Sequence, residues 1–374
     1  PARSLTMAGV TDADRCPGVL RPHLAQDGAV VRIRVPGGQT TGAALGLLSG
    51  IAQQFGSGDL HLTSRASVQL RGLPDPVPAA LIAAVRDAGF LPSETHERVR
   101  NIIASPLSGV SGGLAHIRSL VADLDAGLCA EPRLAGLPTR FLFVVDDGRG
   151  DVSGKSFDLG YRAVDHDYGW LLLGAADLGI SVAAHHAADM LLTLAREFLT
   201  ASRRSGDVWH VRELPSWTTS VPGVRTLSLP LERTEVPLGA VGGAASVQVP
   251  LGSLTPAQGA AVEASAAGPV VITPSRGLVL PGAADRLPEL VAAGLIDDAS
   301  SPWSAISACV GAPSCQKSLI DTRAYATRLA ESGHALPRTH ISGCERRCGA
   351  PTGAHHDLVA PAAASPLLLV GESR

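Results

Sequence analysis

Residues 31–73 read VRIRVPGGQTTGAALGLLSGIAQQFGSGDLHLTSRASVQLRGL, and residues 245–282 read ASVQVPLGSLTPAQGAAVEASAAGPVVITPSRGLVLPG. Both stretches run from a strand pattern through a Val-Pro turn with a glycine to a Thr-led, Ala-rich helix pattern, and then to two further strand patterns. Such self-similarity indicates an internal duplication. The chain is therefore expected to contain two small α+β half-domains, in which Arg65 of the first corresponds to Arg276 of the second.

Shorter matches extend the duplication beyond each half-domain. Residues 100–109 (RNIIASPLSG) resemble residues 304–311 (SAISACVG), and Leu-Pro-Thr-Arg at 137–140 resembles Leu-Pro-Arg-Thr at 336–339. Proline- and glycine-rich joins predict four domains: a half-domain at 1–92, a larger module at 93–230, a second half-domain at 231–299 and a last module at 300–374. Clefts between domains are favoured pocket positions, so we expect a ligand site shared by the duplicated halves.

The composition excludes several classes of protein. With 374 residues, 45% of them hydrophobic and 17% charged, the chain can bury a large core and is too apolar to be disordered. A net charge of -3 and an aromatic content of 3% provide neither the basic field nor the stacking rings of a nucleic-acid-binding protein. No apolar run approaches the roughly 18 residues of a membrane span. We therefore expect a cytoplasmic protein that binds neither nucleic acid nor membrane.

Four of the six cysteines lie close together in the last module. They form two pairs, Cys309-x5-Cys315 and Cys344-x3-Cys348, and nearby glycines and prolines let the backbone turn around the sulfurs. Structural zinc sites prefer two to four residues between paired ligands and often include histidine, whereas thiolate-only quartets also suit iron–sulfur clusters. The spacing favours an iron–sulfur cluster, with zinc or four reduced thiols as the alternatives.

The basic side chains are almost all arginine, since the 31 basic residues include only two lysines. Guanidinium groups bind carboxylates with two parallel hydrogen bonds. Arginines stand at the ends of the strand patterns, and Thr63, Arg65 and Gln69 are expected to alternate onto one side of their strand. This grouping predicts a polyanionic ligand. The chain has no dinucleotide-binding or P-loop motif, so electrons are expected to come from a separate reductase or ferredoxin.

The duplication, with a four-cysteine motif in the second half, resembles the nitrite and sulfite reductase family over nearly the whole chain. The resemblance implies an α+β fold in which two ferredoxin-like half-domains and two larger α/β modules surround a central cleft. It also implies a four-iron four-sulfur (4Fe-4S) cluster on the four cysteines, with Cys348 bridging to a sirohaem.

The same resemblance implies which residues bind the tetrapyrrole or anion. The matching motifs are VRIRVPGG, HLTSRASVQ, VRNII and GLPTRFLF, and the residues that they carry are Arg34, Thr63, Arg65, Gln69, Arg100, Asn101 and Arg140. Arg276 joins this set as the expected counterpart of Arg65. The expected catalytic residues are Arg34, Arg100 and Arg140.

Two features distinguish this chain from the anion reductases that it resembles. Leu142 stands where those reductases carry a second lysine, two residues after the position of Arg140, so one cation is missing from the implied anion site. The stretches at 14–21 (DRCPGVLR), 144–148 (VVDDG) and 343–349 (GCERRCG) are similar instead to the branch of the family that oxidises a tetrapyrrole in aerobic cobalamin synthesis.

That branch implies a monooxygenase, in which O2 and NADH-derived electrons hydroxylate a tetrapyrrole substrate at a meso carbon and an acetate side chain closes a lactone. The arginines would hold the substrate carboxylates. The cluster would pass single electrons to an additional, non-haem iron or to a sirohaem, because O2 needs a metal or organic cofactor to react. Two alternatives stay open: a sirohaem-dependent sulfite or nitrite reductase, and a non-enzymatic protein in which zinc holds the second half together.

Overall fold

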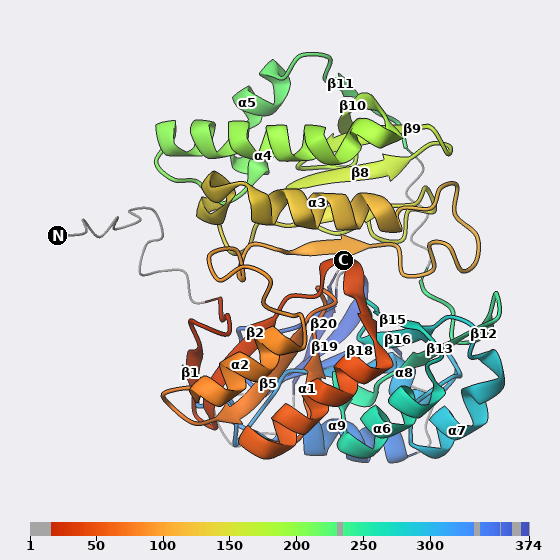
Figure 1. Cartoon of the computed structure of the whole chain (residues 1–374). Coiled ribbons are helices and arrows are strands. Elements are labelled where there is room, and N and C mark those ends of the chain that lie inside the picture. The colour runs from red at the N-terminus through yellow and green to blue at the C-terminus, as the bar shows by residue number, and fades with distance from the viewer. Residues whose placement is uncertain (1–15, 230–234, 333–336, 352, 361–367, 374) are drawn as a thin grey trace. The chain divides into compact units, whose positions relative to one another are not determined.

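The structure is a computed structural model of the chain, and it describes residues 16–229, 235–332, 337–351, 353–360 and 368–373 (Figure 1). These residues divide into two compact units. Unit 1 contains residues 16–20, 33–38, 89–229 and 235, and unit 2 contains residues 21–32, 39–88 and the described part of 236–374. The predicted boundary at 230/231, and residues 14, 15 and 336 of the quoted motifs, lie outside the described residues.

The first half-domain of unit 2 is a five-stranded sheet with two helices. Its strands, in spatial order, are β1 (His23–Ala25), β2 (Gly28–Ile33), β5 (Val68–Leu73), β4 (Leu60–Leu62) and β14 (Ser253–Leu254). Its helices are α1 (Gly42–Phe55) and α2 (Ala79–Asp87). Leu45 and Leu48 of α1 are buried, as are Val68 and Leu70 of β5, so the helical and the period-two apolar patterns both supply the core.

The second half-domain repeats this plan. Its strands, in spatial order, are β12 (Gly239–Val241), β13 (Ala244–Gln248), β16 (Gly277–Leu280), β15 (Pro269–Ile272) and β3 (Gln39–Thr41). Its helices are α6 (Pro256–Ser265) and α7 (Leu287–Ala292). The long helix of each copy is capped by a threonine: Thr41 Oγ1 accepts from Ala44 N–H, and Thr255 Oγ1 accepts from Gln258 N–H. The duplication predicted from the sequence is confirmed in the order of strands and helices.

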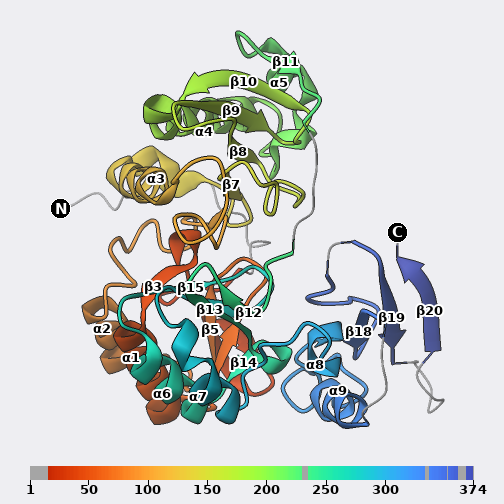
Figure 2. The same ribbon diagram turned by 90° about the vertical axis from the view of Figure 1, so that its right-hand side faces the viewer.

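The two half-domains exchange their edge strands. β3 comes from the first copy but pairs antiparallel with β15 of the second, whereas β14 comes from the second copy but pairs antiparallel with β4 of the first. Helices α1 and α6 lie side by side (Figure 2). Gly42 permits this close approach, because a Cβ at that position would lie 3.0 Å from Ala266 Cβ. Each sheet therefore contains one strand of the other copy.

The last module of unit 2 carries the four cysteines. Its strands, in spatial order, are β17 (Ile306–Ala308), β18 (Thr339–Ser342), β19 (His355–Val359) and β20 (Leu368–Ser373), and its helices are α8 (Pro302–Ala305) and α9 (Thr322–Glu331). The first three strands are parallel, and β20 is antiparallel to β19. Ala326 and Ala330 of α9 share a core with Ile306 and Ile341 of the sheet.

Unit 1 is built on a six-stranded sheet. Its strands, in spatial order, are β11 (Arg225–Thr226), β10 (Leu178–Ala183), β9 (Tyr168–Leu173), β8 (Leu159–Ala163), β7 (Phe143–Asp146) and β6 (Ile102–Ala104). Its helices are α3 (Arg118–Ala130), α4 (Ala187–Arg204) and α5 (Pro215–Ser220). Helices α3 and α4 lie on this sheet (Figure 1). Leu124 of α3 and Phe198 of α4 belong to its main core. β6, β7 and β8 are parallel, which matches β17, β18 and β19 and agrees with the second part of the sequence repeat.

The remaining described helices are short. They are 3-10 helices at Pro36–Gly38, Pro132–Gly136, Ala184–His186, Val211–Glu213, Pro250–Gly252 and Ala284–Arg286. Within the described ranges, no helix combines the length and the apolar composition that crossing a bilayer requires.

One strand of the first half-domain is shorter than the sequence pattern indicated. β4 ends at Leu62 and β5 follows after a turn, so Thr63 and Arg65 lie in that turn. The expectation that Thr63, Arg65 and Gln69 alternate along one strand is therefore wrong. The turn competes with the strand because Thr63 Oγ1 accepts hydrogen bonds from the backbone N–H groups of Arg65 and Ser67.

The equivalent turn of the second copy corrects the predicted correspondence of two arginines. Thr273 Oγ1 accepts from the N–H group four residues later, as Thr63 Oγ1 does. Matching these threonines aligns Arg276 with Ala66, and both residues have positive φ (66° and 51°). The predicted correspondence of Arg276 with Arg65 is wrong by one residue, because the sequence pattern did not reveal which turn residue has the left-handed backbone.

Candidate functional site

The four cysteines lie on two loops that leave the same edge of the last sheet. Cys309 directly follows β17, and Cys344 lies two residues after the end of β18. These strands are parallel neighbours, so their carboxyl ends meet. Cys315 and Cys348 lie farther along the same two loops. Carboxyl ends of parallel strands are common ligand-binding positions.

Close packing holds these two loops together. Gly343 N–H donates a hydrogen bond to Cys309 Sγ at 3.3 Å. A Cβ at position 343 would overlap Ser318 Oγ, so this position requires glycine. A Cβ at Gly311 would overlap Thr322 Oγ1, and the φ of Gly311 is +70°. Gly343 thus follows from the approach of the second loop to the first, whereas Gly311 follows from the packing of the first loop against the start of α9.

The separation of the sulfur atoms bears on which metal group the four cysteines could hold. Among the described residues, one group of three Cys, His, Asp or Glu side chains has its ligand atoms within 4.8 Å of one another, and it is Asp146, Asp147 and Asp151. No three of the four sulfur atoms are therefore that close. A single zinc, with Zn–S bonds of about 2.3 Å, would bring its sulfurs to within about 4 Å of one another. The donor set fits a cluster, in which each thiolate binds a separate iron.

The four thiols still lie near enough to influence one another. Burial raises the pKa of the Cys348 thiol, Arg346 opposes this shift, and Cys309, Cys344 and Cys315 add to it. Thiolates gathered in this way repel one another unless positive charge compensates them. The iron ions of a cluster would supply that charge.

Two arginines of the half-domains reach the cysteine loops. Arg71 Nη2 donates to the carbonyl of Ser314, just before the second cysteine, at 3.3 Å. Arg276 Nη2 donates to the carbonyl of Gly349, just after the last cysteine, at 2.8 Å. The sequence predicted Arg276 as a substrate-binding residue, and the structure shows it in contact with the backbone of a cysteine loop.

A polar network beside these arginines was not found from the sequence. Arg323 Nη2 donates to His61 Nδ1 at 3.1 Å and Arg323 Nη1 donates to Ser253 Oγ at 3.0 Å. Ser253 Oγ in turn donates to Asp59 Oδ2 at 2.8 Å. Burial, Arg323 and then Arg71 lower the pKa of His61 to about 3, so the imidazole is neutral. The sequence signal that could have indicated this network is the i, i+2 spacing of Asp59 and His61 at a short strand, which places both side chains on one face.

In unit 1, two predicted residues have protein partners of their own. Arg100 donates from Nε and Nη2 to the two carboxylate oxygens of Asp125, at 2.7 and 2.6 Å, and its side chain is 6% exposed. Asn101 Nδ2 donates to the carbonyls of Thr139 and Arg98. These contacts fix the start of β6 against α3 and against the chain that leads to β7.

Arg34 and Arg140 differ in exposure. Arg34 is buried, with Nη1 3.5 Å from the carbonyl oxygen of Pro17. Arg140 is exposed, and its guanidinium carbon lies 5.7 Å from the centre of the Trp209 ring, within cation–π range. Leu142, two residues farther on, is buried in the sheet. Of the predicted residues in unit 1, Arg140 is the one at the surface.

The other predicted residues belong to unit 2. Arg65 is half-buried in its turn, and the Gln69 amide oxygen, oriented to satisfy both neighbours, accepts from Arg32 Nε and Nη2. Unit 1 holds Arg34, Arg100, Asn101 and Arg140, whereas unit 2 holds Thr63, Arg65, Gln69, Arg276, Cys309, Cys315, Cys344 and Cys348. The grouping of these residues into one substrate site stays a prediction.

The acidic group of unit 1 does not fit an oxygen-activating iron. Asp147 binds Arg149 Nε and Nη2 at 2.8 and 2.7 Å, and Arg149 Nε lies 3.8 Å from Asp151 Oδ2. Asp146 accepts from three backbone N–H groups. Iron sites of non-haem oxygenases combine two histidines with one carboxylate and keep open positions. This group has no imidazole, and a guanidinium already compensates its charge, so we assign no residue to a second iron.

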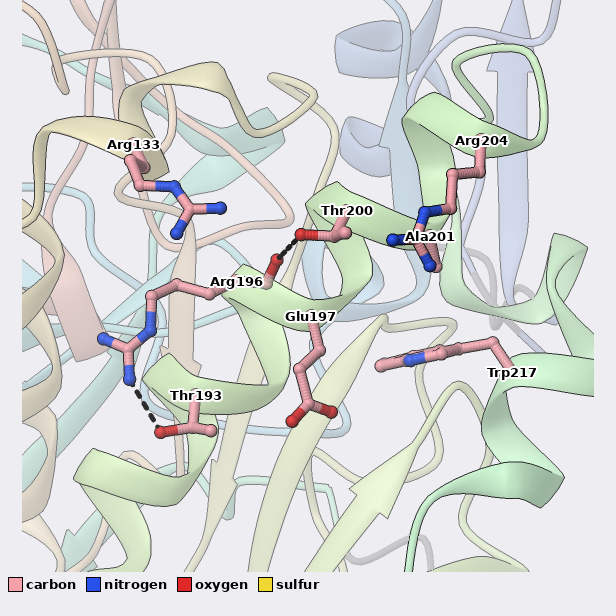
Figure 3. Close-up of a pocket in the computed structure, with 8 residues that line it drawn as sticks. All are labelled: Arg133, Thr193, Arg196, Glu197, Thr200, Ala201, Arg204 and Trp217. Carbon is pink, nitrogen blue, oxygen red and sulfur yellow. Dashed lines mark hydrogen bonds between the residues drawn. The ribbon is translucent and has the colours of Figure 1, made fainter.

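A cavity of about 360 Å³ lies against α4 and α5 of unit 1 (Figure 3). Its lining residues are Arg133, Thr193, Arg196, Glu197, Thr200, Ala201, Arg204 and Trp217. Arg196 Nη2 donates to Thr193 Oγ1 at 2.8 Å, and Glu197 adds a negative charge among the arginines. None of the predicted site residues lines this cavity.

Part of this chain matches a family model, and two named proteins are similar to most of it. Residues 23–88, from β1 to just after α2, match the model of the nitrite/sulfite reductase ferredoxin-like half domain. A Sinorhizobium protein named precorrin-3B synthase is 26% identical over 380 residues, which cover 92% of this chain and 80% of that protein. A Synechococcus elongatus protein named ferredoxin–nitrite reductase is 24% identical, with 86% of this chain and 74% of that protein covered.

A solved structure shares the fold. The Mycobacterium tuberculosis NirA protein matches 92% of this chain and 76% of its own length, with a TM-score of 0.70 and 19% sequence identity. The named relatives align over most of this chain, and the solved structure shares its fold. Residues 23–88 thus match the ferredoxin-like half domain of nitrite/sulfite reductases, and the chain as a whole has the nitrite/sulfite reductase fold.

Proposed function

We propose that this chain is a precorrin-3B synthase, an oxygen-dependent monooxygenase of aerobic cobalamin (vitamin B12) synthesis. In the proposed reaction precorrin-3A is hydroxylated at C20, and an acetate side chain closes a lactone. One atom of O2 enters the product and the other leaves as water. The electrons derive from NADH and arrive through a separate reductase or ferredoxin.

The observation that carries this proposal is Leu142. At this position, where the resemblance implies a lysine in the anion reductases, the chain has a leucine that packs in a core with Ile103 and Val144. A buried leucine neither holds an anion nor donates a proton, so it favours a substrate other than sulfite or nitrite. The relative named precorrin-3B synthase, which aligns over 92% of the chain, supports the same choice.

The proposed role of the arginines is to bind and orient a substrate with many carboxylates. The proposed set is Arg34, Arg65, Arg100, Arg140 and Arg276, because paired guanidinium donors match carboxylate geometry. Arg140 fits this role directly, since it lies at the surface beside Trp209. Arg100 and Arg276 already donate to protein acceptors, so each would use its remaining N–H groups for the substrate.

The four cysteines are the proposed ligands of a 4Fe-4S cluster. When bound, the cluster would supply single electrons for the reduction of O2. Cys309 and Cys315 on one loop, and Cys344 and Cys348 on the other, would hold it. The hydrogen bond from Gly343 N–H to Cys309 Sγ would orient one ligand and offset part of its negative charge.

A sirohaem-dependent nitrite or sulfite reductase is the second candidate function. Relatives named ferredoxin–nitrite reductase from Synechococcus elongatus and Zea mays cover 86% of this chain. Cys348 is exposed, so its thiolate would be accessible to a sirohaem. The two candidates differ in whether a tetrapyrrole is the substrate or a bound cofactor.

Anaerobic purification followed by absorption spectroscopy and by iron, sulfide and zinc analysis tests the proposal. We expect a brown protein with about four sulfides per chain and no sirohaem bands. Incubation with precorrin-3A, a reductant and 18O2 should add one labelled oxygen atom to the product. Sirohaem bands with sulfite or nitrite reduction would favour the second candidate, and one zinc without sulfide would exclude both.

Substitution of single cysteines tests the ligand assignment. Cys315→Ser should abolish the cluster absorbance and the sulfide content. Cys129→Ser is the matched control, because it changes a cysteine of α3 that lies outside the quartet, and it should leave both unchanged. Full cluster absorbance in Cys315→Ser would refute the assignment.

A further inference from the structure

Three arginines of unit 2 lie close enough to influence one another beside the cysteine loops. They are Arg71 on β5, Arg276 in the turn before β16, and Arg323 on α9, and each comes from a different part of the fold. Burial and then Arg71 lower the pKa of Arg323, Asp59 and Cys309 act in the opposite direction, and Arg276 lowers it further. The chain thus concentrates positive charge in one largely buried region.

The nearby carboxylates do not balance this charge. Asp27 binds the β5 arginine through hydrogen bonds of 3.0 and 2.9 Å. Asp59 reaches Arg323 through the hydroxyl of Ser253. Arg276 donates to a neutral carbonyl, and Arg323 Nε is buried without a hydrogen-bond partner among the described residues. Buried positive charge in excess is costly unless a negative group lies close to it.

Comparison of the two copies of the turn shows that only the copy before the cysteine module has an arginine at the left-handed position. The equivalent turn position of the first copy is Ala66, and the module that follows the first copy has no cysteine quartet. In the second copy the left-handed position carries an arginine instead. Gly252 makes room for its side chain, because a Cβ at 252 would lie 2.7 Å from Arg276 Cδ. The arginine therefore occurs in the copy whose next module carries the cluster ligands.

We infer that Arg71, Arg276 and Arg323 form a counter-charge set for the iron–sulfur cluster, which stabilises the reduced cluster and so raises its reduction potential. This inference rests on the proposed function, because it requires the cluster on the four cysteines. A cluster held by four thiolates is net negative, and reduction adds one electron and one further negative charge. Positive groups in a weakly screened region favour the more negative state.

The contacts of the set also give it a positioning role. Arg71 donates to Ser314 O on the first cysteine loop, and Arg276 donates to Gly349 O on the second. Each half-domain thus holds one loop through a charge-assisted hydrogen bond to its backbone. For Arg276 this positioning role differs from the substrate-binding role predicted from the sequence. The variant Arg276→Leu distinguishes the two roles.

Arg276→Leu is the sharpest test, because the arginine bonds a neutral carbonyl and its removal leaves no carboxylate unpaired. The full-length protein is purified anaerobically with its cluster and titrated with a reductant, and electron paramagnetic resonance of the reduced cluster gives the midpoint potential. We expect a more negative potential at unchanged sulfide content. Arg276→Lys should restore most of the potential. Arg328→Leu, which changes an exposed arginine of α9, is the matched control and should not shift it.

Each outcome bears on the inference. An unshifted potential in Arg276→Leu at full sulfide content would overturn it, and so would weaker tetrapyrrole binding at an unshifted potential. If Arg276→Leu loses the cluster, the lysine variant decides: recovery of cluster and potential supports the charge role, and loss in both variants overturns it. A wild-type protein without sulfide would refute the proposed function instead.

Discussion

Removal of Asp125 tests whether Arg100 is a structural or a substrate-binding residue. The side chains of this pair are 6% exposed for Arg100 and 20% exposed for Asp125. Asp125→Ala would leave a buried guanidinium without its carboxylate, and removal of one partner from a buried ion pair costs about 3–5 kcal/mol. Because Asp125 keeps a fifth of its side chain exposed, we expect the low end of this range, about 3 kcal/mol.

Urea-induced unfolding followed by tryptophan fluorescence measures this loss, since Trp170, Trp209 and Trp217 all lie in unit 1. With a urea dependence of about 1–3 kcal/mol per molar, the midpoint should fall by about 1 M or more. The double variant Arg100→Met/Asp125→Leu should recover much of the stability, because an apolar pair carries no desolvation cost. A loss below about 1 kcal/mol in Asp125→Ala, together with weaker tetrapyrrole binding, would contradict the structural role.

Two further predictions concern the cysteine loops and the acidic group. Gly343→Ala should lower the sulfide content of the purified protein and destabilise the fold by about 1–3 kcal/mol, because the new Cβ would overlap Ser318 Oγ. A sulfide content equal to that of the wild type would contradict this prediction. Burial raises the pKa of Asp151 to about 7, so the folded state keeps a proton that the unfolded state has lost. The free energy of unfolding should therefore fall as the pH rises from 3.8 to about 7, and Asp151→Asn should flatten that decline in urea titrations; an unchanged slope in Asp151→Asn would contradict it.

The elements of the half-domains were predictable because their determinants are local. Thr41 and Thr255 cap helices whose buried residues recur at helical spacing, and the apolar side chains of β5 alternate at Val68 and Leu70. The same local patterns gave a wrong prediction after Leu62. The side chain of Thr63 accepts hydrogen bonds from nearby backbone N–H groups, so the strand ends before the residues that the alternating pattern included.

The partners of the arginines were not predictable. Residue type shows that an arginine can bind a carboxylate, but not which acceptor the fold brings within reach. Arg100 meets Asp125 on a helix that follows it, and Arg276 meets Gly349 in another module. The cysteines were recognisable from their spacing in the chain, whereas the separation of their sulfur atoms depends on how two loops pack.

The exchange of β3 and β14 has a consequence for folding and for solubility. β15 and β4 each receive their outer neighbour from a segment far away in the chain, so the edges of both sheets are covered late. An uncovered strand edge is a template on which another molecule can add a strand. A fragment with only one half-domain would present such an edge to its neighbours in solution, and the duplicated chain avoids this by supplying each edge with a strand of its own.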